Sequence, residues 1–387
     1  MMERWELPKG WEWKQLKTLA PVHYGKGLSE KQRRGGNVPV YGANGVVGFH
    51  DVSMTKGQTI VIGRKGSAGA VNWSEIACWP IDTTFFIDEF PKILYPKFLY
   101  KFLRSQQIDR LQQSAAIPGL NRDVLYSIEV PIPYPDDPDR SLAEQRRIVA
   151  RLELLLGETR AMREDIQAMR RDLAQVMESV LAEVFPNPNE EMPKGWDVQE
   201  VRTISEPPQY GYTQSATTEN TGTKFLRITD IQNGNVEWDE VPYCQIDDNN
   251  FDKYALFDGD IVFARSGATT GKTFLVKNPP RAVFASYLIR LRIRGVFPDF
   301  VYWFFQSSHY WNQVRLRGGA QPNMNANLLS QILVPIPKSF SEQRRIVAYL
   351  EHIAEEIRAM DDVLAQDLRD IEVLEQSILA AAFRGEV

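Results

Sequence analysis

Two glycine-bearing loops combine basic and hydroxyl side chains in a way that suits contacts with nucleic acid. The first loop runs Arg64-Lys65-Gly66-Ser67, and the second begins at Arg265 and ends at Lys272. Glycine lets a backbone approach a ligand closely, while arginine, lysine and hydroxyl groups bind phosphates and base edges. For either loop alone a solvated turn is an equally good interpretation, but the recurrence of Arg-x-Gly favours binding. The candidates in the two loops are Arg64, Lys65, Ser67, Arg265, Ser266, Thr269, Thr270 and Lys272.

Amide, aromatic and basic residues elsewhere extend this candidate surface. Two amide-bearing segments, 41–45 and 321–325, could read bases, because Asn and Gln pair bidentately with adenine. In 289–294 apolar residues alternate with arginine, so a strand there would project its arginines from one face. The alternative is a set of solvated turns and an ordinary surface strand. The candidates of this second set are Lys26, Lys31, Arg33, Arg34, Tyr41, Asn44, Asn121, Arg290, Arg292, Gln321, Asn323 and Asn325.

Two segments approach catalytic motifs without completing them. Residues 266–273 differ from a phosphate-binding P-loop at the first position, but a P-loop opens a helix and the residues that follow indicate a strand and a turn. Asn278-Pro279-Pro280 is similar to the motif with which adenine methyltransferases hold a flipped base, yet position 281 is arginine rather than an aromatic residue. We expect a plain turn there.

The sequence offers few residues for a metal site or for nucleophilic catalysis. Cys78 and Cys244 are far apart, and the four histidines are scattered and fall in different places in the two halves. Zinc sites need clustered Cys and His ligands. We therefore predict no catalytic residues and no metal site, and interpret the chain as one that binds rather than catalyses.

Composition is that of an ordinary globular protein and leaves DNA binding open. Of 387 residues, 43% are hydrophobic and 25% charged, with a net charge of −5. The segment 339–387 alone carries 5 basic and 11 acidic side chains, so the rest is nearly neutral and can concentrate cations on one face. No uninterrupted apolar run approaches the ~18 residues of a membrane span, and we expect a cytoplasmic protein with no membrane partner.

The sequence contains two copies of one unit. Pro8-Lys9-Gly10-Trp11 returns at 193–196, Val130-Pro131-Ile132-Pro133 returns at 334–337, and Glu144–Ala150 is identical to 342–348. Each copy has a β-rich first part and ends in a long helix. The predicted domains are β-rich lobes at 1–140 and 186–338, with long helices at 141–185 and 339–387.

Both long helices carry apolar residues at strict 4-3 spacing, which is typical of a coiled coil. Ser141-x-x-Glu144 and Ser339-x-x-Glu342 match capping boxes that would start them. The simplest arrangement is an antiparallel pair, and the alternative is that each helix packs on its own lobe. The seam consists of Ile148, Leu152, Leu155, Met162, Ile166, Leu173, Ile346, Leu350, Ile357, Leu364, Ile371 and Ile378.

Aromatic residues gather at 95–102 and 300–305. We expect them to form the core of a short helix in each lobe rather than a platform for stacked bases.

These blocks in duplicated order resemble the specificity (S) subunit of type I restriction–modification systems over essentially the whole chain. The resemblance rests on the repeated openings, on Tyr41–Gly45, on the two Val-Pro-Ile-Pro segments, on the Glu-Gln-Arg-Arg-Ile-Val-Ala helix starts and on Ala382–Val387. It implies an α+β fold, in which two pseudo-symmetric mixed α/β target recognition domains are separated by an antiparallel coiled coil of two long helices. Each domain would read one half of a bipartite asymmetric DNA site.

The resemblance also implies partners and cofactors that lie outside this chain. Modification (methyltransferase) subunits, two of them, would dock on the helices and bind S-adenosylmethionine, and restriction subunits would use ATP and magnesium to act on double-stranded DNA. Two other hypotheses remain open: an autonomous N6-adenine DNA methyltransferase built on the Asn278 turn, and a coiled-coil scaffold without a DNA role.

Overall fold

The structure, a computed structural model, describes residues 5–108, 119–232, 234–265, 270–318 and 324–387. The chain divides into two compact units, each of which contains parts of both long helices. Unit 1 comprises Met1–Ile166 and Ala365–Val387, and unit 2 comprises Gln167–Leu364. Among the described residues, no helix is long and apolar enough to cross a membrane.

Unit 1 contains three small sheets, with strand orders β1-β9, β2-β8-β5-β6 and β4-β3-β7. The strands are β1 (Trp11–Gln15), β2 (His23–Tyr24), β3 (Val38–Gly42), β4 (Gly45–His50), β5 (Thr59–Gly63), β6 (Val71–Ser74), β7 (Trp79–Pro80), β8 (Thr84–Ile87) and β9 (Glu129–Pro133). The helices are α1 (Leu16–Leu19), η1 (Glu30–Gln32), α2 (Pro96–Ser105), α3 (Arg122–Tyr126) and α4 (Pro138–Val184), which continues into unit 2.

Unit 2 repeats this architecture with sheets β10-β17, β11-β16-β13-β14 and β12-β15. The strands are β10 (Trp196–Glu200), β11 (Gln209–Tyr210), β12 (Lys224–Leu226), β13 (Asp260–Ala264), β14 (Thr273–Leu275), β15 (Ala282–Phe284), β16 (Leu288–Arg292) and β17 (Leu333–Pro337). The helices are η3 (Val201–Thr203), η4 (Ile228–Asp230), α5 (Asp248–Tyr254), α6 (Pro298–Phe304), α7 (Ser308–Gly318), α8 (Ala326–Ser330) and α9 (Phe340–Arg384), which continues into unit 1.

The two four-stranded sheets have corresponding strand orders, and a fully buried strand, β5 or β13, lies inside each. β3 pairs in parallel with β7, as β12 does with β15. The opening strand of each copy pairs with the Val-Pro-Ile-Pro strand, with Trp11 opposite Pro133 and Trp196 opposite Pro337. The predicted α+β fold class, with two pseudo-symmetric lobes and two long helices, is confirmed.

Each lobe has its own hydrophobic core, built on the predicted aromatic helices. Phe98 and Phe102 of α2 are fully buried in unit 1, and Phe300 and Phe304 of α6 are fully buried in unit 2. Each core also receives a phenylalanine from the end of a long helix. Phe383 of α9 enters the core of unit 1, and Phe185, next after α4, enters the core of unit 2. The prediction that these aromatic clusters form cores is confirmed.

A buried glutamine fastens the start of each long helix to its lobe. Gln145 donates to the Ile93 carbonyl at 2.8 Å and accepts from the Tyr95 N–H at 2.8 Å. Gln343 donates to the Pro337 carbonyl at 2.9 Å and accepts from the Phe297 N–H at 2.9 Å. Burying such an amide is favourable only when its donors and acceptors are paired. The glutamine of the duplicated Glu-Gln-Arg-Arg block therefore links each long helix to its lobe. We call this glutamine the helix latch.

The predicted capping boxes are wrong in detail. α4 begins at Pro138, before Ser141, because proline fits the first helical turn and Asp137 accepts from the Arg140 N–H at 3.1 Å. Ser339 does stand directly before α9, but the Glu342 carboxylate pairs with Arg345 at 2.7 Å instead of reaching back. Glu144 pairs with Arg147 in the same way, at 2.9 Å.

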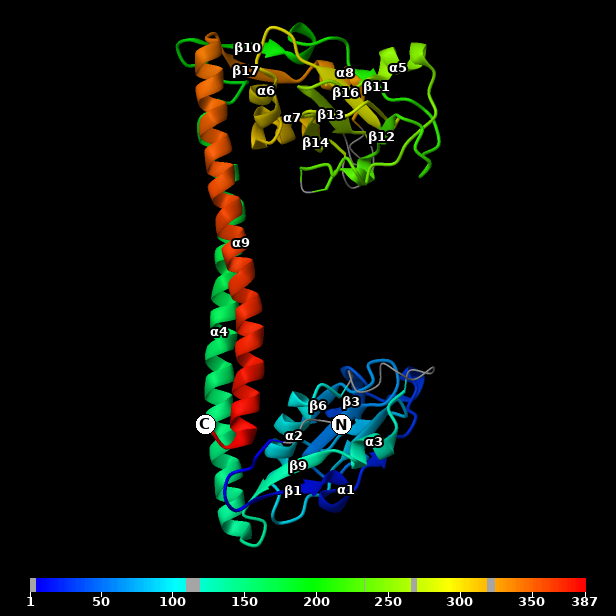
Figure 1. The fold of residues 1–387 in the computed structure, drawn as a ribbon, viewed down its shortest axis with the longest axis vertical. Helices are drawn as coiled ribbons and strands as arrows, with labels where there is room; N and C mark the ends of the chain where they lie inside the picture. Colours follow the sequence, from blue (N-terminus) through cyan, green and yellow to red (C-terminus); the bar gives the residue numbers. More distant parts are fainter. Residues whose placement is uncertain (1–4, 109–118, 233, 266–269, 319–323) are drawn as a thin grey trace. The chain divides into compact units, whose positions relative to one another are not determined.

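Within each unit the two long helices lie side by side and antiparallel (Figure 1). In unit 1, Arg147 donates to the Val387 carbonyl at 2.6 Å and Thr159 donates to Glu375 at 3.0 Å, so residue numbers rise on α4 as they fall on α9. In unit 2, Arg170 makes a two-point contact with Asp361 at 2.6 and 2.9 Å.

The heptad seam differs from the prediction at three places. Ile148 and Leu152 are buried in the lobe core of unit 1, and Ile346 and Leu350 in that of unit 2, because the first turns of each helix pack on a lobe. Met162 is 51% exposed, since two helices cover only a narrow stripe. The remaining predicted seam residues are buried or half-buried: Leu155, Ile166, Leu173, Ile357, Leu364, Ile371 and Ile378.

Candidate nucleic-acid interface

The backbone of Arg64 is fixed between two other segments of unit 1. Its N–H donates to the Thr83 carbonyl at 2.8 Å, and its carbonyl accepts from the Leu120 N–H at 2.8 Å. The preceding Gly63 leaves no room for a side chain, because a Cβ atom there would lie 2.1 Å from the Ser67 carbonyl oxygen. Lys65 and Ser67 are exposed in the same loop, which joins β5 to β6. The loop thus presents polar side chains from a rigid frame.

Arg265 occupies the corresponding frame in unit 2. Its N–H donates to the Tyr287 carbonyl at 3.0 Å, and its carbonyl accepts from the Met324 N–H at 3.0 Å. The loop joins β13 to β14, and Lys272 near its end is exposed, whereas Thr270 is 7% exposed. Each unit therefore holds one arginine at the end of its central strand in the same backbone setting.

Each of these arginines lies over a tyrosine that sequence analysis did not select. The Arg64 guanidinium carbon is 5.2 Å from the centroid of the Tyr24 ring, and that of Arg265 is 4.8 Å from the Tyr210 ring. In unit 1 a second guanidinium, that of Arg122, lies 5.1 Å from Tyr24. The missed signal in the sequence is a Tyr-Gly pair that occurs at corresponding places in both copies.

A cleft of about 960 Å³ in unit 1 brings three predicted residues, Tyr41, Asn44 and Ser67, together with the basic face of α2. That face consists of Lys97, Lys101 and Arg104, at the i, i+4, i+7 spacing of one helix side. Burial lowers the pKa of Lys101; attraction to Glu153 opposes this shift, and Coulombic repulsion from Arg104 and Arg160 adds to it. The spacing of these basic residues was a signal that sequence analysis passed over.

The basic stretch near the start of the chain divides into exposed and engaged residues. Lys26 and Lys31 are exposed. Arg33 donates to the Val47 carbonyl at 2.6 Å and so ties its loop to β4. Arg34 pairs with Asp51 at 3.0 Å, although its side chain remains 64% exposed.

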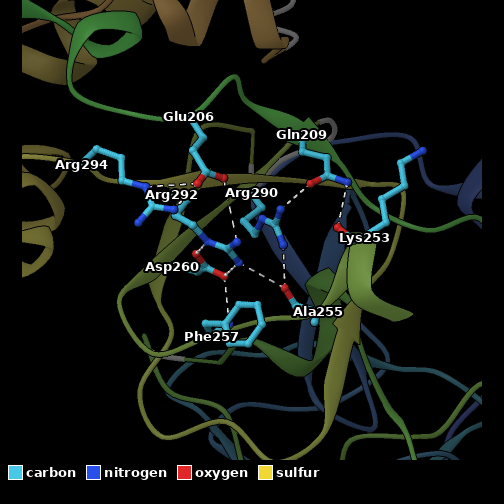
Figure 2. A network of polar contacts seen from close by, with 9 residues as sticks. All are labelled: Glu206, Gln209, Lys253, Ala255, Phe257, Asp260, Arg290, Arg292 and Arg294. Carbon is cyan, nitrogen blue, oxygen red and sulfur yellow. Dashed lines mark hydrogen bonds and ion pairs between the residues drawn. The ribbon is translucent and has the colours of Figure 1, made fainter. Parts of the chain in front are cut away.

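The predicted arginine stripe of β16 is wrong, because Arg290 and Arg292 bind acceptors inside unit 2 (Figure 2). Arg292 makes two 2.8 Å hydrogen bonds to Asp260, which is 1% exposed and lies directly opposite on β13. Arg290 is 6% exposed and donates to the Ala255 carbonyl at 2.6 Å and to Gln209. Of the three arginines, Arg294, paired with Glu206, has a mostly exposed side chain, at 65%.

Burial on both faces of β16 explains this result. Ile289 and Leu291 belong to the main core of unit 2, while Leu288 packs on the other face against Phe284 of β15. A second layer of structure therefore covers the face on which the arginines lie. Buried guanidinium groups are stable only when they are paired, and Asp260 supplies the counter-charge.

Three further candidates have structural roles. Tyr41 is 8% exposed, and its hydroxyl donates to the Trp73 carbonyl at 3.0 Å, so it lines the cleft as a mostly buried residue whose hydroxyl is already engaged. Asn121 caps α3 by accepting from the Asp123 N–H at 3.1 Å, and Asn325 caps α8 by accepting from the Leu328 N–H at 2.9 Å. Both amide oxygens are thus already in use.

Four candidates, Ser266, Thr269, Gln321 and Asn323, lie outside the described residues. The two near-motifs can be placed more fully. Thr273, at the end of the P-loop-like segment, begins strand β14 and not a helix, as predicted. Asn278 has a φ of 42° and lies between β14 and β15, as a turn residue does.

One group in the described part of the chain has metal-ligand geometry: His23, Asp88 and Glu89, whose ligand atoms lie within 4.8 Å of one another. Lys56 occupies both carboxylates, since its Nζ pairs with Glu89 at 2.5 Å and its backbone N–H donates to Asp88 at 3.1 Å. These contacts compete with a metal ion for the same oxygens.

Two lobes with the same four-stranded sheet order, each holding an arginine loop in one backbone frame, define a duplicated protein. The sequence family described as the type I restriction modification DNA specificity domain matches residues 8–168 and again 193–365. The chain belongs to this family.

Among characterised proteins, the chain is similar to the specificity subunit of the type I restriction enzyme EcoKI from Escherichia coli K12. They are 23% identical over 317 residues, which cover 76% of this chain and 66% of that protein. The specificity subunit of EcoBI from Escherichia coli is 22% identical over 300 residues, with 71% and 61% covered. The chain thus spans slightly less than two thirds of the length of these relatives.

Solved structures share the fold. A chain from a study of complex assembly and conformational transition of the type I R-M system superposes with a TM-score of 0.80 at 20% identity, with 99% of this chain and 100% of that chain covered. The HsdS subunit of Thermoanaerobacter tengcongensis gives a TM-score of 0.61 at 21% identity, with 99% of each chain covered.

Proposed function

We propose that this chain is the non-catalytic, sequence-reading subunit of a type I restriction–modification complex, and that each of its two lobes reads one half of a bipartite, asymmetric DNA site. The observation that carries the proposal is the duplicated arginine loop, in which Arg64 and Arg265 have matching backbone hydrogen bonds. A duplicated reader suits a split site, and the family match to both copies supports it.

The residues proposed to contact DNA are those that the fold leaves accessible. In unit 1 the arginine loop and the cleft beside it form one surface, where phosphates would meet lysine and bases would meet arginine or asparagine. Arg290 is left out because it is buried, Arg292 because Asp260 holds its guanidinium, and Tyr41 because its ring is mostly buried and its hydroxyl is engaged. The proposed contacts are Lys26, Lys31, Asn44, Arg64, Lys65, Ser67, Lys101, Arg104, Arg265 and Lys272.

The two long helices are proposed to set the spacing between the half-sites. α4 has 47 residues and α9 has 45. At ~1.5 Å per residue, each is about two DNA turns long. The helices would then determine the length of the gap between the half-sites, and the lobes would determine which bases are read.

Methyltransferase subunits are proposed to dock on the helices. In unit 2 an apolar groove of about 650 Å³ runs between α4 and α9. Met169, Met360 and Val363 line it and are 52%, 54% and 60% exposed. Exposed apolar patches of this kind mark protein interfaces. Two such subunits would supply S-adenosylmethionine chemistry, and restriction subunits would supply ATP- and magnesium-dependent action, all in the cytoplasm with the DNA.

Methylation mapping tests the proposal. The chain is expressed with a methyltransferase subunit from the same genome, and methylated adenines are located by sequencing total DNA. A two-part motif with a fixed gap is expected. Arg64→Ala should relax the bases of one half only, and Arg265→Ala those of the other half, each by ~1–3 kcal/mol of discrimination if the arginine reads a base.

Other outcomes separate the alternatives. Equal weakening on every sequence would indicate phosphate contact by these arginines. Methylation by the isolated chain, with binding of S-adenosylmethionine, would favour an autonomous methyltransferase. A complex without any sequence preference would favour a scaffold.

A further inference from the structure

We propose that Tyr24 and Tyr210 are positioning residues, each of which holds the guanidinium group of the DNA-contacting arginine in its unit. The proposal deepens, and rests on, the function proposed above. The same pair occurs in both units, with the guanidinium carbon 5.2 Å from the ring centroid for Arg64 and 4.8 Å for Arg265. Two independent copies of one contact make a chance approach a poor explanation.

An arginine in these loops needs such support. The backbone hydrogen bonds fix the Cα atom of Arg64, but several side-chain torsions still separate it from the guanidinium group. Within the described part of the chain, neither Arg64 nor Arg265 forms an ion pair within 4 Å with a carboxylate. One N–H of Arg64 donates to the Asp82 carbonyl at 3.2 Å. A cation within about 6 Å of an aromatic ring is attracted to it without losing N–H donors, so the ring can restrict the guanidinium and leave the remaining donors for DNA.

The local backbone places each tyrosine at that spot. Tyr24 lies opposite Phe85 at the edge of its sheet, and Tyr210 lies opposite Ile289. The glycine after each tyrosine permits the approach. A Cβ atom at Gly25 would lie 2.0 Å from the Ile81 carbonyl oxygen, and one at Gly211 would lie 2.2 Å from that of Ala285. Any side chain at the position after the tyrosine would clash in both units, which explains why the Tyr-Gly pair is repeated.

The Tyr24 and Tyr210 rings have different neighbours, and this difference decides how each ring is tested. In unit 1, Arg122 lies 5.1 Å from the same Tyr24 ring. In unit 2 the residue after the capping asparagine is Ala326, whose N–H donates to the Tyr210 hydroxyl at 3.1 Å. Loss of the ring should therefore loosen two guanidinium groups in unit 1 but one in unit 2, although Arg64 keeps the Phe85 ring at 5.9 Å and Arg122 keeps the Tyr126 ring at 5.6 Å. Replacement of Tyr24 by phenylalanine tests whether the aromatic ring is what matters. A double-mutant cycle with Arg265 tests whether Tyr210 acts through that arginine.

The experiment uses the complex of the full chain with its methyltransferase subunit and a duplex that carries the motif found by methylation mapping. Tyr24→Leu should weaken binding roughly two- to fivefold, as expected for an exposed cation–π contact of about 0.5–1 kcal/mol. The loss should vanish on a duplex in which the half-site of unit 1 is scrambled. Tyr24→Phe keeps the ring and should bind within about twofold of the unchanged chain.

A double-mutant cycle at Tyr210 and Arg265 completes the test. If the ring acts through the arginine, Tyr210→Leu should cost nothing further in an Arg265→Ala background. Additive losses from Tyr210→Leu that are absent from Tyr210→Phe, which removes only the hydroxyl bonded to the Ala326 N–H, would overturn the proposal, because they would mean that the ring acts by itself. Unchanged binding by Tyr24→Leu and Tyr210→Leu would also overturn it, while leaving DNA reading intact. A wild-type complex with no two-part motif would overturn the proposed function and this inference together.

Discussion

The ring of Phe383 packs edge-on against the ring of Phe98, with centroids 5.3 Å apart and planes at 72°. Phe383 lies near the end of α9, whereas Phe98 lies in α2 of the first copy. Unit 2 holds the counterpart, in which Phe185, after α4, packs 5.2 Å from Phe300 of the second copy. The core of each lobe is therefore completed by the helix end of the other copy.

Truncation of these phenylalanines should destabilise one lobe at a time. Phe383→Ala should lower the free energy of opening of unit 1 by about 3–5 kcal/mol, because a large buried side chain is lost. Hydrogen exchange of strands β5 and β13 measures the two units separately. Phe185→Ala is the matched control and should affect β13 instead. Equal effects of either variant on both strands would contradict the separate cores.

Removal of a helix latch should lower stability by more than the loss of one exposed amide side chain would. Gln145→Ala leaves the Ile93 carbonyl and the Tyr95 N–H without their partner, which should lower stability by about 1–3 kcal/mol. Exchange of amides in α2 and the first turns of α4 reports the effect. Gln167→Ala, at an exposed position of the same helix, should change little. A neutral Gln145→Ala would show that water replaces the latch.

The β16 network should behave as a structural feature of unit 2. Asp260→Ala leaves Arg292 with the more distant Glu206, 3.9 Å away, as its counter-charge and should destabilise unit 2 by about 3 kcal/mol in urea unfolding. Arg294→Ala removes an exposed pair with Glu206 and should cost under about 1 kcal/mol. Comparable losses from the two variants would show that Asp260 is less shielded from water than its 1% exposure indicates.

The buried thiol of unit 2 should resist alkylation. Burial raises the pKa of Cys244 to about 11, so the reactive thiolate is scarce near pH 8. Iodoacetamide labelling should be slow in the native chain and fast in urea, while an added exposed thiol, Ser179→Cys, should react at an ordinary rate. Fast native labelling of Cys244 would mean that its site opens readily.

The same shift has a defined sign for stability. The folded state favours the protonated thiol, so this contribution is complete below the unfolded pKa near 9 and is lost as pH rises toward 11. A Cys244→Ala chain should lose less stability than the unchanged chain over that interval.

Subunit docking should depend on the groove of unit 2. Val363→Asp places a charge among apolar residues and should weaken retention of the methyltransferase subunit by about tenfold or more, if about 1.5–3 kcal/mol of apolar burial is lost. Arg358→Ala, exposed on the same helix and outside the groove, is the control. Retention equal to that of the unchanged chain would place the docking surface elsewhere.

The duplication and the long helices could be predicted because they are periodic in sequence. Repeated blocks identify two lobes, and 4-3 spacing identifies α4 and α9 without knowledge of their neighbours. The ends of the seam could not be predicted. Ile148 and its counterpart Ile346 follow the heptad pattern, yet both pack on a lobe core. Periodicity reports that a face is covered, and it does not report by what.

The candidate site shows a similar limit. Alternation in β16 correctly places Arg290 and Arg292 on one face, but the burial of that face depends on β15 and the loop of Ala255. Tyr24 was missed because the sequence does not show which residue it lies opposite. Its pairing with Phe85 across the sheet brings its ring to Arg64. The Arg64 and Arg265 loops could be proposed from the sequence, because an arginine followed by a nearby glycine is a local pattern that does not depend on distant residues.

The placement of Phe383 bears on the order of events during synthesis. Phe98 and Phe102 leave the ribosome long before the residue that completes their aromatic cluster. Until α9 is made, the nascent first lobe exposes an apolar socket, a state that invites aggregation or chaperone capture. Folding of the first lobe should thus wait until α9 has been made, which couples this lobe to synthesis of the second copy.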